Sequence, residues 1–265
     1  MPFAELLARS SFSFLRGASQ PEEMVSRAKE LGQSALGLCD RDGLYGVVRA
    51  FARARETEQR LIVGAELSLA PPGTVVERSD SWQRAARSEP DGVEASSSDA
   101  LHDAPTVALL ALDHTGYTNL CRLLTRAHAG LPKGEALLEI DALDAHHEGL
   151  VAVVPGASFP GASDTPHRAL YGALADTFGA ERAFVAAWRR LDEFDAERVA
   201  AAVDASNRYG LPVVASARPL YHHRSRKPLA DVMHCIRVGT TLDRAGTDLE
   251  ANSEAYLRSD FEMRR

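Results

Sequence analysis

Short apolar runs alternate along the chain with longer segments in which apolar residues recur every three or four positions. The short runs predict buried strands early in 3–19 and over 34–40, 60–69, 106–112, 149–154, 183–188 and 211–216. The longer segments predict helices after Ser19, over 43–56 and 116–130, near 165–178 and 193–208, and in a closing helix that stops at Gly239. Ser19 is the expected N-cap of the first of these helices. This alternation predicts an α/β fold with a parallel sheet, either closed as a barrel or doubly wound.

The segment 71–105 interrupts this pattern, because it is rich in Pro, Gly, Ser and Asp and has little apolar periodicity. A loop of this length within a compact domain is usually an insertion or a lid. We therefore expect 71–105 to be a disordered surface insertion. A partner-binding segment that folds on contact is the alternative.

Composition narrows the class of protein. The 265 residues, 45% of them hydrophobic, suffice for one α/β barrel or two smaller domains. The net charge of −7 argues against a free-standing nucleic-acid binder. Three widely spaced cysteines without a CxxC pair indicate reduced thiols in the cytoplasm rather than a disulfide framework or zinc knuckle. There is no signal-peptide core and no apolar segment long enough to span a bilayer, so we expect no membrane partner.

Charged residues follow several of the predicted strands, namely Arg9, Asp40, Arg41, Glu66 and Arg218. In parallel α/β folds the carboxyl ends of the strands carry the chemistry, and two carboxylates there could bind a metal ion. Alternatively, Asp40 caps the helix that begins near Gly43, and Glu66 pairs with an arginine such as Arg9 or Arg41. Spacing alone favours this second interpretation, because a hydrolytic metal site normally includes several histidines.

Larger blocks of sequence carry a family resemblance. They are FAELLARSSFSFLRGASQPEEMVSRAKELGQSALGLCDRDGLYGVVRAF, LIVGAELSL, LLALDHTGYTNLCRLLTRAH, HHEGLVAVVPG and the segment from GLPVVASARPLYHH to the last residue. In this order they resemble the PHP (polymerase and histidinol phosphatase) domain of bacterial C-family DNA polymerases. The stretches FSFLRGAS and KPLADVMHCIRVG, followed by LEAN, are similar to the error-prone branch of these polymerases.

The resemblance implies a distorted (β/α)7 TIM-like barrel, the PHP fold, over 1–265, without the palm, thumb and fingers of a polymerase. In active members of the family, histidines, aspartates and a glutamate hold metal ions that hydrolyse phosphate esters. Only Asp40 and Glu66 keep a ligand identity here, and the other ligand places hold Leu7, Arg9, Arg41, Arg218 and Leu220. Arginine is a permanent cation that repels a metal ion. The resemblance therefore implies a vestigial metal site and no catalytic residue.

The expected function is that of a non-catalytic PHP domain of an error-prone DNA polymerase, a structural platform in DNA repair and damage-tolerant synthesis. Its expected partners are the rest of the polymerase and its accessory proteins, with DNA reached indirectly. The alternative is a metal-dependent phosphoesterase with a reduced Zn or Mn site at Asp40 and Glu66; otherwise no cofactor is expected. Arg224, Arg226 and Lys227 form a basic stretch that could contact DNA phosphate or a neighbouring domain, or lie in a solvated loop.

Overall fold

The structure, a computed structural model, describes residues 2–70, 76, 78, 104–156 and 164–264. Its strands are β1 (Glu5–Ala8), β2 (Leu36–Arg41), β3 (Leu61–Ala70), β4 (Thr106–Ala111), β5 (Leu138–Glu139), β6 (Leu150–Val154), β7 (Ala183–Ala187) and β8 (Val213–Ala215). Its α-helices are α1 (Pro21–Glu30), α2 (Val47–Thr57), α4 (His114–His128), α5 (Asp164–Phe178), α6 (Asp195–Tyr209), α7 (Lys227–Val238), α8 (Leu242–Ala245) and α9 (Asp260–Met263). The expected insertion 71–105 lies outside the described residues, apart from Val76, Arg78, Ala104 and Pro105.

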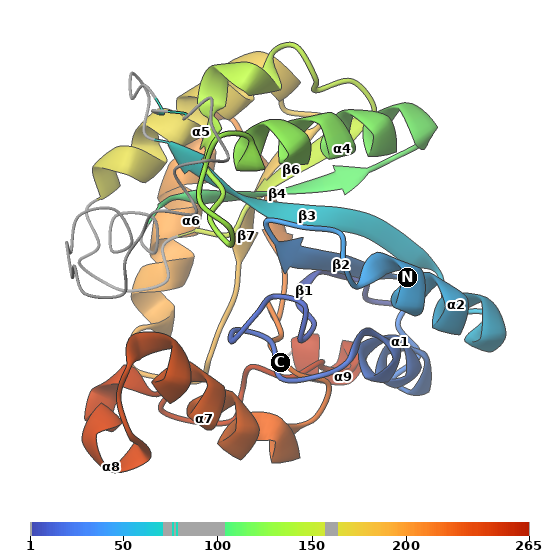
Figure 1. Cartoon of the computed structure of the whole chain (residues 1–265), viewed down its shortest axis with the longest axis vertical. Helices are drawn as coiled ribbons and strands as arrows, with labels where there is room; N and C mark the ends of the chain where they lie inside the picture. The colour runs from blue at the N-terminus through green and yellow to red at the C-terminus, as the bar shows by residue number, and fades with distance from the viewer. Residues whose placement is uncertain (1, 71–75, 77, 79–103, 157–163, 265) are drawn as a thin grey trace.

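The strands form one curled sheet in the order β1-β2-β3-β4-β6-β7-β8, with β5 paired to β3. Neighbouring strands are parallel except at β4, which is antiparallel to both β3 and β6. The arrowhead of β4 accordingly points away from those of β2 and β3 in Figure 1. The prediction of a fully parallel sheet was wrong for this strand. Apolar periodicity is the same in both directions of a strand, so it could not reveal the reversal.

Apolar side chains cover both faces of the sheet. Leu38 and Leu109 pack on the side of the helices, in clusters that include residues of α1, α2 and α4. The adjacent Cys39 and Leu110 belong to a separate cluster contributed by strands alone. Because successive side chains of a strand point to opposite faces, the sheet has a helix-covered outer face and its own inner core. This half-barrel confirms the expected α/β fold of the TIM-like kind.

A buried glutamate links the two ends of the strand order, β1 and β8. The Glu5 carboxylate accepts hydrogen bonds from Leu7 N at 2.9 Å, Ser216 Oγ at 2.5 Å and Ala217 N at 2.7 Å. Arg9 N also donates to Pro219 O at 3.1 Å. Burial raises the pKa of Glu5, although these hydrogen bonds oppose the rise. The described strands thus close through side-chain and loop contacts where no ladder joins β1 to β8.

The sequence correctly predicts the residue that ends α7 but not the residue that caps the start of α1. Gly239 ends α7 with a φ of 69°, as predicted. Ser19 was predicted to cap α1, but the N-cap is Gln20, in a capping box with Glu23. Ser19 Oγ instead accepts a hydrogen bond from His222 N at 2.9 Å. It therefore connects the start of α1 to the loop before α7. Within the described ranges, no helix has the length and apolar character needed to cross a membrane.

Candidate functional site

The polar residues predicted at the strand ends do converge at one end of the curled sheet. Arg9 follows β1, Arg41 is the last residue of β2, and Glu66 lies opposite Arg41 on the neighbouring strand β3. Arg218 follows β8 and reaches the same glutamate. The structure therefore brings Arg218 to a glutamate that lies 152 residues away in the sequence.

Glu66 is the centre of this arrangement, with an exposed fraction of 1%. Arg9 Nε donates to its Oε2 at 3.0 Å, and Arg9 Nη2 forms an ion pair with the same oxygen. Thr106 Oγ1 at 2.7 Å and Arg218 Nη2 at 3.2 Å donate to Oε1. Burial by itself would raise the pKa of Glu66, but the charges of Arg9 and Arg218 outweigh it and hold the pKa well below its usual range. Glu66 is therefore an ionised anchor for two arginines.

Asp40, the second carboxylate of the predicted site, is held by serines of the loop after β1. Ser10 N and Ser13 Oγ each donate to its Oδ1 at 2.7 Å, and Ser10 Oγ donates to Oδ2 at 2.7 Å. The alternative that Asp40 caps the helix near Gly43 was wrong, because its carboxylate accepts from the loop after β1 and α2 has Gly46 as an N-cap without a side-chain bond. Asp40 therefore holds in place the loop after β1, which begins with Arg9.

Arg41 and Asp42 form a separate polar unit at the end of β2. Arg41 Nε donates to Asp42 Oδ2 at 3.1 Å and to Ser68 Oγ at 2.9 Å. Ser68 N and Ser68 Oγ both donate to the Asp42 carboxylate at 2.7 Å. Asp42 has a φ of 52°, a left-handed conformation that Asp tolerates better than most residues. Arg41 consequently does not pair with Glu66, contrary to one alternative drawn from the sequence.

Arg218 lies in a cationic neighbourhood that the sequence pattern did not reveal. Its guanidinium carbon lies 5.4 Å from the ring centroid of Trp188, which also carries Arg190 and Arg198 at 4.7 Å. Arg190 Nη2 donates to Arg218 O at 2.8 Å and supports its left-handed φ of 44°. Burial lowers the pKa of Arg218 to about 10, against the opposing charge of Glu66. Arg218 thus remains a cation at neutral pH.

Leu7 and Leu220 both pack in hydrophobic clusters. Leu7 is 1% exposed in the inner cluster of strands, beside Cys39 and Val153. Leu220 packs against the cluster of Ala18, Tyr221 and Tyr256. Neither side chain offers a lone pair to a metal ion, and both contribute to packing.

The residues present do not fit the metal cluster that the fold family implies. All four oxygens of Asp40 and Glu66 accept hydrogen bonds from protein donors, so a metal ion would have to displace them. Two of the donors to Glu66 are guanidinium groups, which repel a cation. The described part of the chain contains no group of three or more His, Cys, Asp or Glu side chains arranged for a metal ion. Asp40 and Glu66 therefore offer a metal ion no free carboxylate oxygen.

The basic stretch before α7 is ion-paired. Arg226 forms an ion pair with Glu23, Arg224 lies 3.3 Å from Glu254, and Lys227 donates to Asp231 at 2.7 Å. These partners neutralise the charges that would attract DNA phosphate. The stretch therefore connects α1 to the C-terminal region within the chain.

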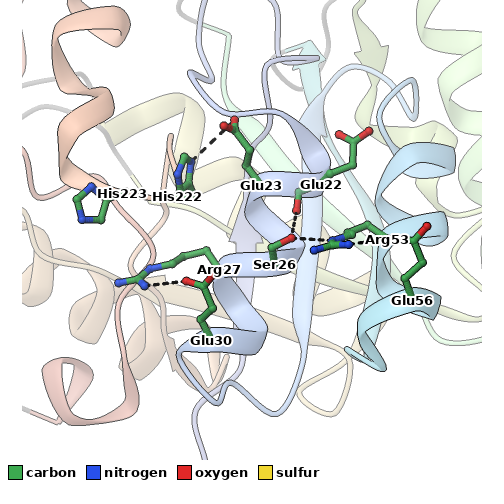
Figure 2. Close-up of a pocket in the computed structure, with 9 residues that line it drawn as sticks. All are labelled: Glu22, Glu23, Ser26, Arg27, Glu30, Arg53, Glu56, His222 and His223. Atoms are coloured by element: carbon green, nitrogen blue, oxygen red, sulfur yellow. Dashed lines mark hydrogen bonds and ion pairs between the residues drawn. The ribbon is translucent and has the colours of Figure 1, made fainter.

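A polar pocket of about 570 Å³ lies beside this stretch, between α1, α2 and residues 222–223 (Figure 2). Its side chains pair largely with one another, within each helix and between Arg53 and Ser26. Arg27 donates to Glu30 at 3.0 Å, and Arg53 donates to Glu56 at 3.0 Å and to Ser26 at 2.8 Å. These exposed pairs contribute little stability and leave no evident set of groups converging on a ligand.

Sequence reasoning missed several residues that shape the site: Ser10, Ser13, Ser68, Thr106, Trp188 and Arg190. Serine and threonine carry no spacing signal in a loop or at a strand end. The hydrogen bond from Thr106 to Glu66 depends on the antiparallel pairing of β4 with β3. This pairing places Ala108 of β4 opposite Glu66 of β3. Only the three-dimensional structure could place these donors.

With this geometry established, comparison with known proteins defines the class of the chain. Residues 5–202 match the PHP domain, so the chain belongs to the PHP domain family. The chain is 40% identical over 99% of its length to an error-prone DNA polymerase of Anaeromyxobacter sp. (strain K), and covers 21% of that protein. The corresponding enzyme of Mycolicibacterium paratuberculosis is 38% identical over 100% of the chain, which covers 23% of it. The chain thus spans about a fifth of the length of these curated relatives.

Two solved structures are similar at 13% identity and a TM-score of 0.48. One, from Bifidobacterium adolescentis, is assigned as a metal-dependent phosphoesterase; the match covers 81% of this chain and 86% of that chain. The other, an amidohydrolase from Chromobacterium violaceum, matches over 80% of this chain and 86% of that chain.

Proposed function

We propose that this chain is the PHP domain of an error-prone DNA polymerase and serves there as a non-catalytic structural platform. The observation that supports this proposal best is the state of its two remaining family carboxylates. Asp40 secures a loop, and Glu66 anchors two arginines that stand at former ligand places. Metal-assisted hydrolysis needs ligands free to hold the ion. We therefore propose that the site binds no Zn or Mn and that its role is architectural.

A platform also needs a surface for the rest of the polymerase, and α7 offers one. Leu229, Val232 and Ile236 are 43%, 39% and 61% exposed and follow helical spacing. An exposed apolar stripe of this kind is typical of an interaction surface. We propose that the rest of the polymerase packs on this α7 stripe, while DNA is contacted by other parts of that protein in the cytoplasm.

The first experiment measures metal content. The purified chain is exposed to zinc and manganese, dialysed, and analysed by elemental mass spectrometry. A stoichiometry near zero is the expected result. One or more retained ions that are lost in Asp40→Ala or Glu66→Ala would contradict the proposal and favour the metal-dependent phosphoesterase. A phosphatase assay with a generic aryl phosphate, run on the same samples, is expected to give no activity above that of both variants.

A further inference from the structure

His128, the last residue of α4, contacts two backbone carbonyl groups from different parts of the chain. Its Nε2 lies 2.7 Å from Asp42 O, directly after β2, and its Nδ1 lies 3.0 Å from Glu135 O, in the loop between α4 and β5. A carbonyl oxygen only accepts hydrogen bonds, so each ring nitrogen has to donate. Neutral imidazole carries a single N–H. Both contacts are therefore satisfied only by the doubly protonated imidazolium.

Charged side chains reach this region from several elements that pack together. The strands β3, β4 and β6 pack on α4 and contribute Glu66 alone, which is bound by Arg9 and Arg218. The other charged side chains belong to α4, the loop after it, β5, the end of β2 and Arg78; they are Arg122, Arg126, Lys133, Glu135, Glu139, Arg41, Asp42 and Arg78.

These surroundings accept a further positive charge. Glu139 forms ion pairs with Arg78 and Arg126, and another ion pair joins Arg41 to Asp42. Three of the surrounding arginines thus have anionic partners that offset their repulsion. The last turn of a helix also favours a cation, because the aligned peptide dipoles place partial negative charge there.

The contact with Asp42 stabilises a turn of unfavourable backbone conformation. Asp42 has a left-handed φ of 52°. Asp42 N donates to Glu66 O at 2.8 Å, and its carboxylate accepts from Ser68 N at 2.7 Å. Peptide groups and carboxylates do not change protonation between pH 6 and 8, whereas histidine does. The bond from His128 is therefore the one support of this set that responds to pH near neutrality.

We propose that His128 is a pH-sensitive latch, which joins the end of α4 and the loop after it to the end of β2. With two ring protons, His128 binds both carbonyl groups. When the pH rises and one proton leaves, one ring nitrogen becomes an acceptor that faces a carbonyl oxygen, and this contact becomes repulsive. The connection between the loop and the end of β2 is then lost. This inference does not depend on the proposed platform role.

Nitrogen-15 NMR of the full chain, labelled at histidine, tests the protonation state directly. Through-bond correlations assign the ring signals of His128 among the nine histidines. His147 is the matched control, because its Nδ1 contacts a single carbonyl, Asp144 O at 2.9 Å, which one ring proton satisfies. At pH 7.5 we expect two ring protons on His128 and one on His147. A single ring proton on His128 at that pH would overturn the proposal.

Chemical denaturation from pH 5.5 to 8 measures what the latch contributes. Below pH 6 both the folded and the unfolded chain carry the second proton, so the stabilisation is complete; it decreases as the pH rises. The folding equilibrium constant of the wild type, relative to that of His128→Gln, should therefore fall about tenfold between pH 5.5 and 8, as for the loss of one charge-assisted hydrogen bond.

The control variant His147→Gln keeps the latch. The ratio of the wild-type folding constant to that of His147→Gln should stay within about twofold over the same pH range. A ratio for His128→Gln that does not change with pH, or equal changes in the two variants, would contradict the latch. The NMR experiment uses the wild-type chain, so it decides the question even if His128→Gln does not fold.

Discussion

Glu66 is a buried carboxylate whose surroundings make it the anchor of two ion pairs. Its carboxylate is buried, and its charge is balanced by Arg9 and Arg218 rather than by a metal ion. A buried ion pair adds little stability compared with an apolar substitute, but removal of one partner leaves an uncompensated charge. Glu66 therefore contributes to folding as the counter-ion of these two arginines.

The first prediction concerns this anchor. Glu66→Gln should lower the free energy of unfolding by about 3–5 kcal/mol, because it leaves two buried arginines without their counter-ion. Urea denaturation followed by circular dichroism at pH 7 measures the change. Thr106→Val is the control: it removes one hydrogen bond to Glu66 and keeps both ion pairs, so its cost should be about 1 kcal/mol. Equal effects of the two substitutions would show that the ion pairs are not the main contribution.

The second prediction concerns pH. The folded-state pKa of Glu66 is lowered from its ordinary value of 4.5, so the folded state binds fewer protons than the unfolded state below that pH. The stability contributed by Glu66 is full above pH 4.5 and is lost as the pH falls toward the folded-state pKa. The difference in unfolding free energy between the wild type and Glu66→Gln should therefore be constant from pH 7 to 5 and shrink below 4.5. A difference that stays constant down to pH 3 would contradict the ion-pair account.

At the scale of the elements, β1 decides how the sheet closes. This strand has only four residues, Glu5–Ala8, and its first side chain reaches the segment after β8. Helices α1 and α2 cover the outer face of the sheet beside β1. Their residues Met24, Ala28 and Ala50 pack on Leu36 and Leu38 of β2. A short strand with one polar link thus connects the first and last parts of the half-barrel.

The third prediction tests this link. In Glu5→Gln an amide NH2 replaces one accepting oxygen, so a buried N–H of Leu7 or Ala217 loses its acceptor. The free energy of unfolding should fall by about 1–3 kcal/mol. Glu58→Gln, at the exposed end of α2, changes the same chemical group and should stay within about 0.5 kcal/mol of the wild type. Chemical denaturation of the three proteins in parallel provides the measurement, and an unaffected Glu5→Gln would mean that the link is dispensable.

At the scale of the whole molecule, the exposed apolar stripe on α7 is a surface that this chain does not need for its own stability. Figure 1 shows α7 on the outside of the molecule, away from the helices that cover the sheet. Its exposed leucine, valine and isoleucine contribute little to the stability of the chain itself. In the proposed platform they would be buried against the rest of the polymerase.

The fourth prediction follows from this difference. Ile236→Asp should change the unfolding free energy of the 265-residue chain by less than about 0.5 kcal/mol, because the side chain is 61% exposed. In an error-prone polymerase that carries this domain, the same substitution should lower the melting temperature and the primer-extension rate. Val203→Asp on α6, which is 45% exposed, is the control and should leave both unchanged. A polymerase indifferent to Ile236→Asp would remove α7 as the docking surface.

The sequence by itself determined the α/β class and most of the elements, because periodicity and residue identity are local properties. The end of α7 at Gly239 and the apolar character of Leu7 follow from residue identity without coordinates. The tertiary structure alone decided that β4 runs antiparallel, that Glu66 pairs with Arg9 and Arg218 but not with Arg41, and that Asp40 holds a serine loop. Strand direction and ion-pair partners depend on which distant residues the sheet brings within a few ångströms. Hydrophobic pattern carries no information on that proximity.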